Sequence, residues 1–323
     1  MTLITTPNLV LCELGPGPHD ALESYSAHCL KIHRALKLHG LTYTRRHGTA
    51  PSDFKHLNPA ARVPVLLVDG KPVFETTCIL ERLETISTTR LVPADPHQAA
   101  LAWSWEEFAD TTLSGFVVAA RWADERNWPS VRKAFFGHAP PPIRWIVPTL
   151  LRRSILKGLD QRDVWHLGPD HCWNRFQTVL DHLEQLSPTR GFWMESPSPT
   201  VADVAMFAQL QSLRLPLTPW QAQQIDARPT LAAWLDRVHD ASHPSSPPAS
   251  TLSPNALTPD STSHQQLPAS MEQHHPMGSN APDVPEAHDM VHQGSSTHPA
   301  VQLEGLASTP LGLSPLDHHV SSE

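Results

Sequence analysis

The stretch Asn58–Thr76, NPAARVPVLLVDGKPVFET, decides the fold of the first part of the chain. Two apolar runs, VPVLLV and KPVFE, are joined by Asp69-Gly70, a pair that suits the tight turn of a β-hairpin. Pro64 stands where the first strand should begin to pair, although proline has no backbone N–H to donate. Glu75 follows as a lone carboxylate. The stretch therefore predicts a hairpin with an unusual entry, next to a charged side chain.

The segments around this hairpin alternate between strand and helix patterns. NLVLCEL and LTYTRRH are rich in strand formers, and between them lies SAHCLKIHRALKLHG, in which Cys29, Ile32 and Leu36 share one helical face. A short helical turn, SDFKHLNP, precedes the hairpin, and Ile79 and Leu83 begin an apolar stripe after it. The order β-α-β-α-β-β-α predicts a small mixed sheet in which the first two strands are parallel and the last two antiparallel.

After the linker STTRLVPADPH the pattern becomes wholly helical. Leu101, Trp105 and Phe108 recur on one helical face, as do apolar residues of later segments. The clearest helix start is TVADVAMFAQLQSL, where Thr200 and Asp203 have the spacing of a capping box. The tryptophans of this half are expected to be core residues, and none is assigned to a site.

We expect three parts: an α/β domain over residues 7–88, an all-helical domain over 95–241 and a disordered tail over 242–323. After Ser242 the sequence has no Lys, Arg, Phe, Trp or Tyr and is rich in Pro, Ser, Thr and His. Such a segment cannot bury enough apolar surface to offset the entropy of ordering it. The fold class is therefore α/β plus all-α, with a disordered extension.

Charge and cysteine usage restrict the possible partners. Eight of the 32 acidic residues lie after Ser242, which leaves 24 acidic and 24 basic residues before it. A neutral folded part argues against nucleic acid as a partner. No apolar run is long enough to span a bilayer, and the N-terminal residues make a poor signal peptide. The four cysteines show no metal or disulfide spacing, which favours a cytoplasmic protein.

Histidines are concentrated in the tail. Nine lie between His243 and His319, and a flexible chain could gather several around zinc, nickel or copper. None shows a convincing spacing for an ordered site, so the tail is interpreted as a linker or tether. No metal site is assigned, and a tail-driven metal binder stays a minor alternative.

Four segments together resemble the glutathione transferase superfamily. NPAARVPVL is similar to the family's Asn-Pro-x-Gly-x-Val-Pro-x-Leu, and FETTCILERLE to its Glu-Ser-x-x-Ile-x-x-Tyr-Leu. SAHCLKIHRAL resembles its Ser-Pro-x-x-x-Lys-Val helix start, and SPTVADVAMF its Thr-x-Ala-Asp capping motif. The resemblance covers about residues 9–240. It implies a thioredoxin-like domain followed by a helical bundle, with glutathione as the co-substrate.

The resemblance implies a set of binding residues around the opening stretch. It implies a cis bond between Val63 and Pro64, which would leave the N–H and C=O of Val63 free to pair with an extended peptide such as glutathione. Glu75 and Thr76 would hold the γ-glutamyl end, and Arg62 the glycyl carboxylate. The alternatives are that Glu75 and Thr76 only cap a helix and that Arg62 is a solvated surface residue.

By the same resemblance Ser26 is the catalytic candidate. At a helix N-terminus its hydroxyl could donate to a thiolate, and the helix dipole would lower the thiol pKa. Ser24 or Tyr25 could take this role if the loop register differs, and Ser26 could be an N-cap alone. Serine in the first position of Ser26-x-x-Cys29 argues against thiol–disulfide exchange, and Cys29 is expected to lie in the core.

The expected function is activation of the glutathione thiol for attack on a small apolar electrophile, with a homodimer as the usual state of the resembled family. Ala27, Ala61 and Thr76 depart from the family's pattern and weaken the case for turnover. FFGHAPPPIRWIVPTLLRRSILKGLDQRD loosely resembles the metaxin-related branch. The alternative is therefore a non-catalytic binding module whose helical domain holds a protein partner.

Overall fold

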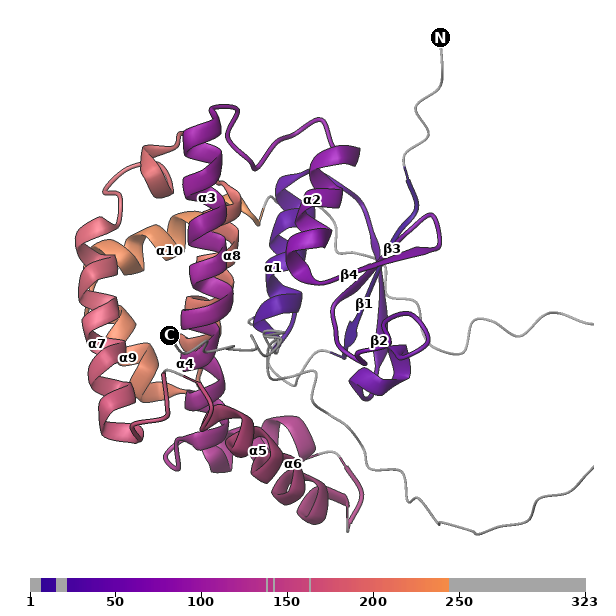
Figure 1. The fold of residues 1–323 in the computed structure, drawn as a ribbon, viewed down its shortest axis with the longest axis vertical. Coiled ribbons are helices and arrows are strands. Elements are labelled where there is room, and N and C mark those ends of the chain that lie inside the picture. Colours follow the sequence, from indigo (N-terminus) through magenta and orange to yellow (C-terminus); the bar gives the residue numbers. More distant parts are fainter. Residues whose placement is uncertain (1–6, 16–21, 138, 142, 163, 244–323) are drawn as a thin grey trace, which may run out of the picture. The chain divides into compact units, whose positions relative to one another are not determined.

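The computed structural model describes residues 7–15, 22–137, 139–141, 143–162 and 164–243. Within them a four-stranded sheet flanked by helices is followed by an all-helical region, which confirms the predicted fold class (Figure 1). Residues 244–323, almost all of the predicted tail, lie outside the described part.

The sheet has the strand order β2-β1-β3-β4. Its strands are β1 (Leu9–Leu14), β2 (Thr44–Gly48), β3 (Val65–Val68) and β4 (Lys71–Phe74). β1 is parallel to β2, because a helix connects them, and antiparallel to β3. β3 is buried along its whole length, whereas β4 is the exposed edge.

The hairpin forms as its sequence predicts. Val68 pairs with Lys71 across the turn, and Asp69 and Gly70 both have positive φ, 50° and 80°. Two successive residues in this region give the type I′ turn, whose twist matches that of the strands. The Val63–Pro64 bond at the entrance to β3 is cis.

Two helices of this domain frame the site described below. They are α1 (Ala27–Leu38) and α2 (Thr76–Ile86), and a short 3₁₀ turn, η1 (Pro51–Phe54), precedes β3. α1 lies between the sheet and α8 (Val201–Leu213) of the helical region (Figure 1), so even its charged residues Lys31 and Arg34 are fully buried. The side chains of α1 must therefore find their polar partners inside the protein.

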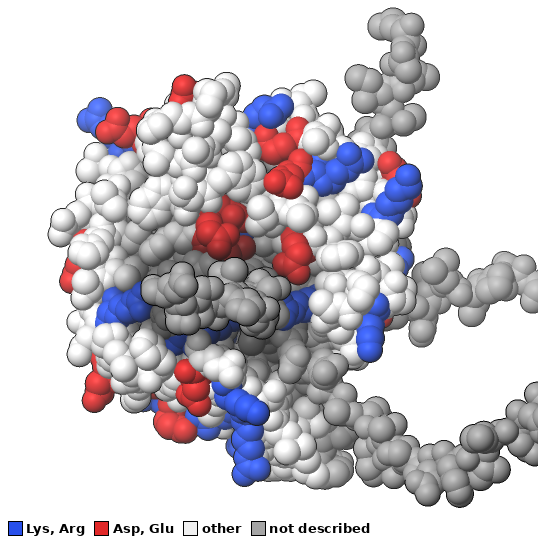
Figure 2. Space-filling model, in the orientation of Figure 1, with Lys and Arg blue, Asp and Glu red and all other residues white. Residues whose placement is uncertain are grey.

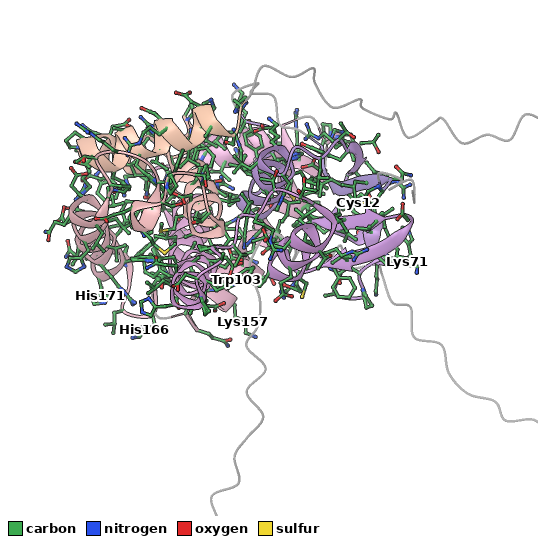
Figure 3. The ribbon with its side chains drawn as sticks, turned by 90° about the horizontal axis from the view of Figure 1, so that it is seen from above. Cys12, Lys71, Trp103, Lys157, His166 and His171 are labelled. Carbon is green, nitrogen blue, oxygen red and sulfur yellow. The ribbon has the colours of Figure 1, made fainter. Side chains whose placement is uncertain are left out.

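The helical region begins with one long helix that contains two π-helical segments. Its elements are α3 (Pro96–Phe108), η2 (Ala109–Leu113), α4 (Ser114–Val118), η3 (Ala119–Ala123), α5 (Trp128–Phe136), α6 (Ile143–Leu159), α7 (Pro169–Leu186), η4 (Trp193–Glu195), α8 (Val201–Leu213), α9 (Pro219–Asp226) and α10 (Pro229–Ala241). π segments are often found at functional positions, and η2 contributes a residue to the site. Figure 3 shows Cys12 and Lys71 in the sheet domain and His166 and His171 at the far side of the helical region.

The predicted capping box anchors α8, a helix that is buried along almost its whole length. The N–H and hydroxyl of Thr200 both donate to Oδ2 of Asp203, at 2.8 and 2.9 Å. The other carboxylate oxygen accepts from the N–H of Trp193 and the indole of Trp234, at 2.8 and 2.9 Å. Burial raises the pKa of Asp203, and these four donors stabilise its charged form. The box thus ties three segments of the bundle to one carboxylate.

The surface and the cysteines add two observations. Lys or Arg and Asp or Glu side chains are interspersed on the face drawn in Figure 2. Cys12, Cys29 and Cys172 are buried and Cys78 is exposed, and all four are free thiols. In the described part of the chain, no helix is long and apolar enough to cross a membrane.

Candidate functional site

The N-terminus of α2 presents a strained residue with an unused charge. Glu75, its N-cap, has φ 68°, and its side chain makes no capping hydrogen bond. The carboxylate is exposed and forms no hydrogen bond or ion pair with the described residues. A non-glycine residue held in this conformation costs about 1–3 kcal/mol, and such outliers gather at binding sites. The Glu75 side chain therefore does not cap α2, and its carboxylate is left open to solvent.

Val63 has unpaired backbone groups and lies near the N-terminus of α2. Its side chain is buried, but among the described residues neither its N–H nor its C=O makes a hydrogen bond. The carbonyl of Arg62 accepts from Nδ2 of Asn58 at 3.1 Å, which fixes the segment before the cis bond. The Arg62 side chain is half-buried. An extended peptide could pair with Val63 as an additional short strand.

Thr76 belongs to a buried network that the sequence did not predict. Its hydroxyl accepts from Nζ of Lys31 at 3.1 Å and donates to Oδ2 of Asp110 at 2.9 Å. Lys31 also donates to Asp110, at 2.8 Å, and to Glu106, which in turn accepts from the hydroxyl of Thr77 at 2.8 Å. The network joins α1, α2, α3 and η2 at one point.

The charges of this network stabilise one another. Burial alone would lower the pKa of Lys31, but the carboxylates of Asp110 and Glu106 outweigh it and the pKa is raised. Burial would likewise raise the pKa of Asp110, yet Lys31 and His28 bring it down to about 2. Both partners are therefore charged at neutral pH, in a region where an unpaired charge would be costly.

The network changes what α2 can offer to a ligand. Because the Thr76 hydroxyl is engaged with Lys31 and Asp110, the groups of the first turn still open are backbone N–H groups. Those of Thr76 and Thr77 make no hydrogen bond with the described residues. Free N–H groups at a helix N-terminus bind anions such as carboxylates.

The structure places Ser26 as the N-cap of α1. Its hydroxyl oxygen accepts from the N–H of Cys29 at 3.3 Å, and its own N–H donates to the Ser24 hydroxyl at 3.2 Å. The Tyr25 ring packs against Phe135, with the ring centroids 5.4 Å apart. Cys29 is fully buried, as expected of a core residue, and burial raises the pKa of its thiol.

His28 and Arg162 are further polar residues that the sequence did not mark. Nδ1 of His28 lies 3.9 Å from Oδ1 of Asp110, and burial lowers its pKa against the attraction of that carboxylate. Glu75 and Arg162 also lie close enough to influence His28. Burial and the nearby Arg62 lower the pKa of Arg162. Arg62 and Arg162 thus influence each other, and Arg162 and the open carboxylate of Glu75 both act on His28, through their charges.

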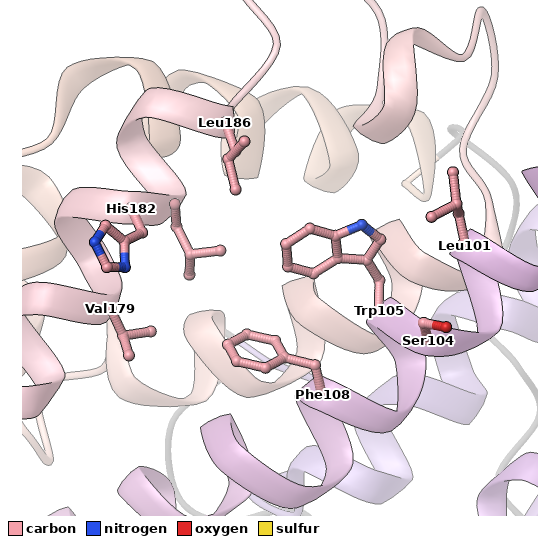
Figure 4. Close-up of a pocket in the computed structure, with 8 residues that line it drawn as sticks. Leu101, Ser104, Trp105, Phe108, Val179, His182 and Leu186 are labelled. Carbon is pink, nitrogen blue, oxygen red and sulfur yellow. The ribbon is translucent and has the colours of Figure 1, made fainter.

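An apolar groove lies elsewhere, between α3 and α7 (Figure 4). It encloses about 530 Å³ and is lined by Leu101, Ser104, Trp105, Phe108, Val179, His182, Leu183 and Leu186. Figure 4 shows Val179, His182 and Leu186 opposite Trp105 and Phe108. None of the site residues described above lines this groove. Within the described residues, no group of three or more His, Cys, Asp or Glu side chains could hold a metal ion.

Comparison with known proteins agrees with the arrangement of the two regions. The N-terminal domain of glutathione S-transferases matches residues 25–86, and the C-terminal domain of the same proteins matches residues 158–237. A probable glutathione S-transferase of Nicotiana tabacum is 34% identical over 98 residues, which are 29% of this chain and 44% of that protein. The chain thus spans less than half the length of this relative.

Two further comparisons concern the protein LigF of Sphingobium sp. strain SYK-6. Its sequence is 27% identical over 206 residues, 58% of this chain and 73% of LigF. The crystal structure of beta-etherase LigF has a TM-score of 0.48 at 23% identity and covers 72% of this chain and 95% of that one. Kinship with the metaxin-related branch is not confirmed by these matches. Residues 25–86 and 158–237 of the chain are therefore glutathione S-transferase domains, the N-terminal one before the C-terminal one.

Proposed function

We propose that this protein is a glutathione transferase-type enzyme that binds glutathione along Val63, Glu75 and α2 and activates its thiol at Ser26 for attack on a small apolar electrophile. The observation that carries the proposal is Glu75, held at φ 68° with an exposed carboxylate that has no partner among the described residues. The names of the relatives, glutathione S-transferases and LigF, support the same activity.

The groups left open in the protein match the polar groups of the tripeptide. The N–H and C=O of Val63 would pair with the backbone of the cysteinyl residue. Glu75 would pair with the α-ammonium, and the N–H groups of Thr76 and Thr77 would receive the α-carboxylate. Arg62 would pair with the glycyl carboxylate, with Arg162 beside it. Each interaction joins a charge to an opposite charge or a donor to an acceptor.

The chemistry then follows from the position of Ser26. The positive end of the α1 dipole favours a thiolate over a thiol, and the Ser26 hydroxyl would donate to its sulfur. The thiol proton leaves to solvent, the sulfur forms a bond to the electrophilic carbon, and the leaving group departs with the electron pair of its own bond. A β-ether belongs among the electrophiles to test, since LigF is described as a beta-etherase.

Calorimetric titration of the full chain with glutathione tests the binding site. We expect wild-type protein to bind in the micromolar to millimolar range and Glu75→Ala to lose binding, because the charge-assisted pair to the ammonium is gone. Glu81→Ala removes another exposed carboxylate of α2 and serves as the matched control. No heat of binding for the wild type, or equal losses in both variants, would contradict the proposal.

Formation of a glutathione conjugate tests the catalytic role. Ser26→Ala should abolish conjugation and raise the pH at which the bound thiol ionises, measured by thiolate absorbance. Ser24→Ala is the matched control, because it removes a neighbouring hydroxyl that accepts from the N–H of Ser26 and does not cap α1. If Ser24→Ala abolishes conjugate formation and Ser26→Ala does not, the catalytic hydroxyl belongs to Ser24.

Two further parts of the proposal concern the state of the protein. A homodimer would give the apolar groove between α3 and α7 a partner, and light scattering of the purified protein measures it. A cytoplasmic location suits four free thiols, one of them exposed. The comparisons do not favour the alternative of a non-catalytic module, and glutathione binding without turnover is the result that would restore it.

A further inference from the structure

The α5–α6 hairpin is an acid-free, strongly basic segment. From Trp128 to Leu159 the sequence contains no Asp or Glu. Its basic residues are Arg132, Lys133, Arg144, Arg152, Arg153 and Lys157. The matched family domains stop at residue 86 and resume at 158, so neither of them accounts for this segment. In Figure 2, Lys and Arg side chains lie near the lower edge, where α5 and α6 lie in Figure 1, with some Asp or Glu side chains beside them.

α6 has one face that the fold uses and one that it does not. The inward stripe is apolar and almost completely buried, at Leu151, Ile155 and Leu159. On the opposite face, residues spaced at i, i+4, i+7 and i+11 point to solvent. They are Ile146, Leu150, Arg153 and Lys157, all of them exposed. The outward face is therefore apolar in its first half and cationic in its second.

The apolar part of this face is unusually open. Trp145, Ile146 and Leu150 are 55%, 54% and 59% exposed. Their clustering on one helix makes a patch, whereas a single exposed apolar side chain would be ordinary. The guanidinium groups of Arg132 and Arg144 lie 4.8 and 5.7 Å from the centre of the Trp145 ring. An exposed indole thus stands between two cations.

Surface cations of the described part fall into two groups, those with an ion pair and those without one, such as Arg46, Arg82 and Arg190. Arg126, Arg214 and Arg228 pair with aspartates at 2.6 to 2.7 Å. Within the described part of the chain, Arg144, Arg153 and Lys157 have no ion pair. Arg152 is set apart, because it donates to the carbonyl of Trp122 and to Glu125 and so fixes the hairpin to η3. The remaining cations are available to an external anion.

We propose that the outward face of the α5–α6 hairpin docks on an anionic lipid surface. Such a surface attracts basic residues over a Debye length and accepts tryptophan and aliphatic side chains at the headgroup level without a shaped pocket. Both properties match this face, whereas an acidic polypeptide would leave the apolar side chains uncovered. α6 lies on the surface and does not cross it. The proposal is independent of the glutathione site.

Sedimentation of the full chain with lipid vesicles tests it. We expect binding to vesicles of phosphatidylcholine and phosphatidylserine and much weaker binding to phosphatidylcholine alone. Arg153→Gln with Lys157→Gln should lower the partition coefficient about 25-fold, since each cation near an anionic surface contributes a factor of about five. Ile146→Ser with Leu150→Ser should also lower it, and here the loss should persist at high salt.

The matched control is Lys71→Gln with Arg82→Gln. Both residues are exposed in the sheet domain, so the double variant makes the same change in net charge away from the hairpin. Unchanged binding of this control supports the proposal, and a loss equal to that of the hairpin variant overturns it. Failure of the wild type to sediment also overturns it. Binding to soluble polyglutamate, lost in the hairpin variant, would then identify an acidic polypeptide as the partner.

Discussion

The N-termini of α1 and α2 differ in whether the side chain at the N-cap position closes the helix. At α1, Ser26 caps its helix by accepting from Cys29, and the residue is nearly buried. At α2, Glu75 occupies the cap position without capping, in a strained conformation and exposed to solvent. A capped terminus adds stability, whereas an open one keeps its N–H groups for a ligand. The first terminus is therefore closed by its own side chain, whereas the second keeps the open groups on which the proposed glutathione site depends.

The largest expected effect comes from breaking the network that holds the open terminus. Lys31→Met removes the cation between Glu106 and Asp110 and leaves two carboxylates without their partner. We expect the free energy of unfolding to fall by about 3–5 kcal/mol in denaturant titrations. Lys37→Met, which removes a more exposed partner of Glu23, is the control and should cost about 1 kcal/mol or less. Equal losses would mean that Lys31 is not a structural centre.

The second prediction concerns Glu13, a buried carboxylate that faces α1, and the stability of the protein at low pH. Burial opposes the charge of Glu13, but His33, His47 and Arg45 lower its pKa to about 2. Its stabilising contribution is therefore complete above about pH 4.5 and is lost as the pH falls toward 2. Over this range the wild type should lose about 3 kcal/mol more stability than Glu13→Gln. Melting temperatures measured across the range decide the question, and parallel curves would refute it.

The third prediction concerns the charge of Glu75 at the N-terminus of α2. Glu75→Gln keeps the size of the side chain and removes only its charge. We expect the Kd for glutathione to rise by about ten- to a hundred-fold, since a hydrogen bond to a charged group contributes about 1.5–3 kcal/mol. The free energy of unfolding should not change, because this carboxylate has no partner among the described residues. A large loss of stability would show that Glu75 supports the fold.

The same comparison predicts a loss of stability at α1. Ser26→Ala removes the oxygen that accepts from Cys29. The free energy of unfolding should fall by about 1 kcal/mol, the usual cost of a lost N-cap, in denaturant titrations. Ser26→Asp retains an acceptor and should recover most of that stability without restoring conjugation. If Ser26→Ala is as stable as the wild type, the cap contributes nothing.

The smallest expected effect runs in the opposite direction. Glu75→Gly places glycine at φ 68°, where it has no steric penalty. The variant should be up to about 1 kcal/mol more stable than the wild type, reduced by the greater freedom of glycine in the unfolded chain. Glutathione binding should nevertheless be lost. Gain of stability together with loss of binding would show that the strain is maintained for the ligand.

Local patterns were sufficient for most of the fold. Asp69-Gly70 predicted the hairpin, and Thr200 with Asp203 predicted the start of α8, because both depend on residues only one to three positions apart. The fold class followed from the order of such segments. For the site, the resemblance named Ser26 and Glu75, but their opposite use as caps became visible only in the structure.

The sequence therefore predicted most elements, their order and the family resemblance, whereas the pairing of the polar groups depends on the tertiary structure. Lys31 meets Asp110 across 79 residues, and no local spacing announces such a pair. It forms because α1 is covered on both sides at this point and the side chain of Lys31 has no access to water. α6 packs on the bundle through one face, at Leu151 and Ile155, and its outward face stays uncovered.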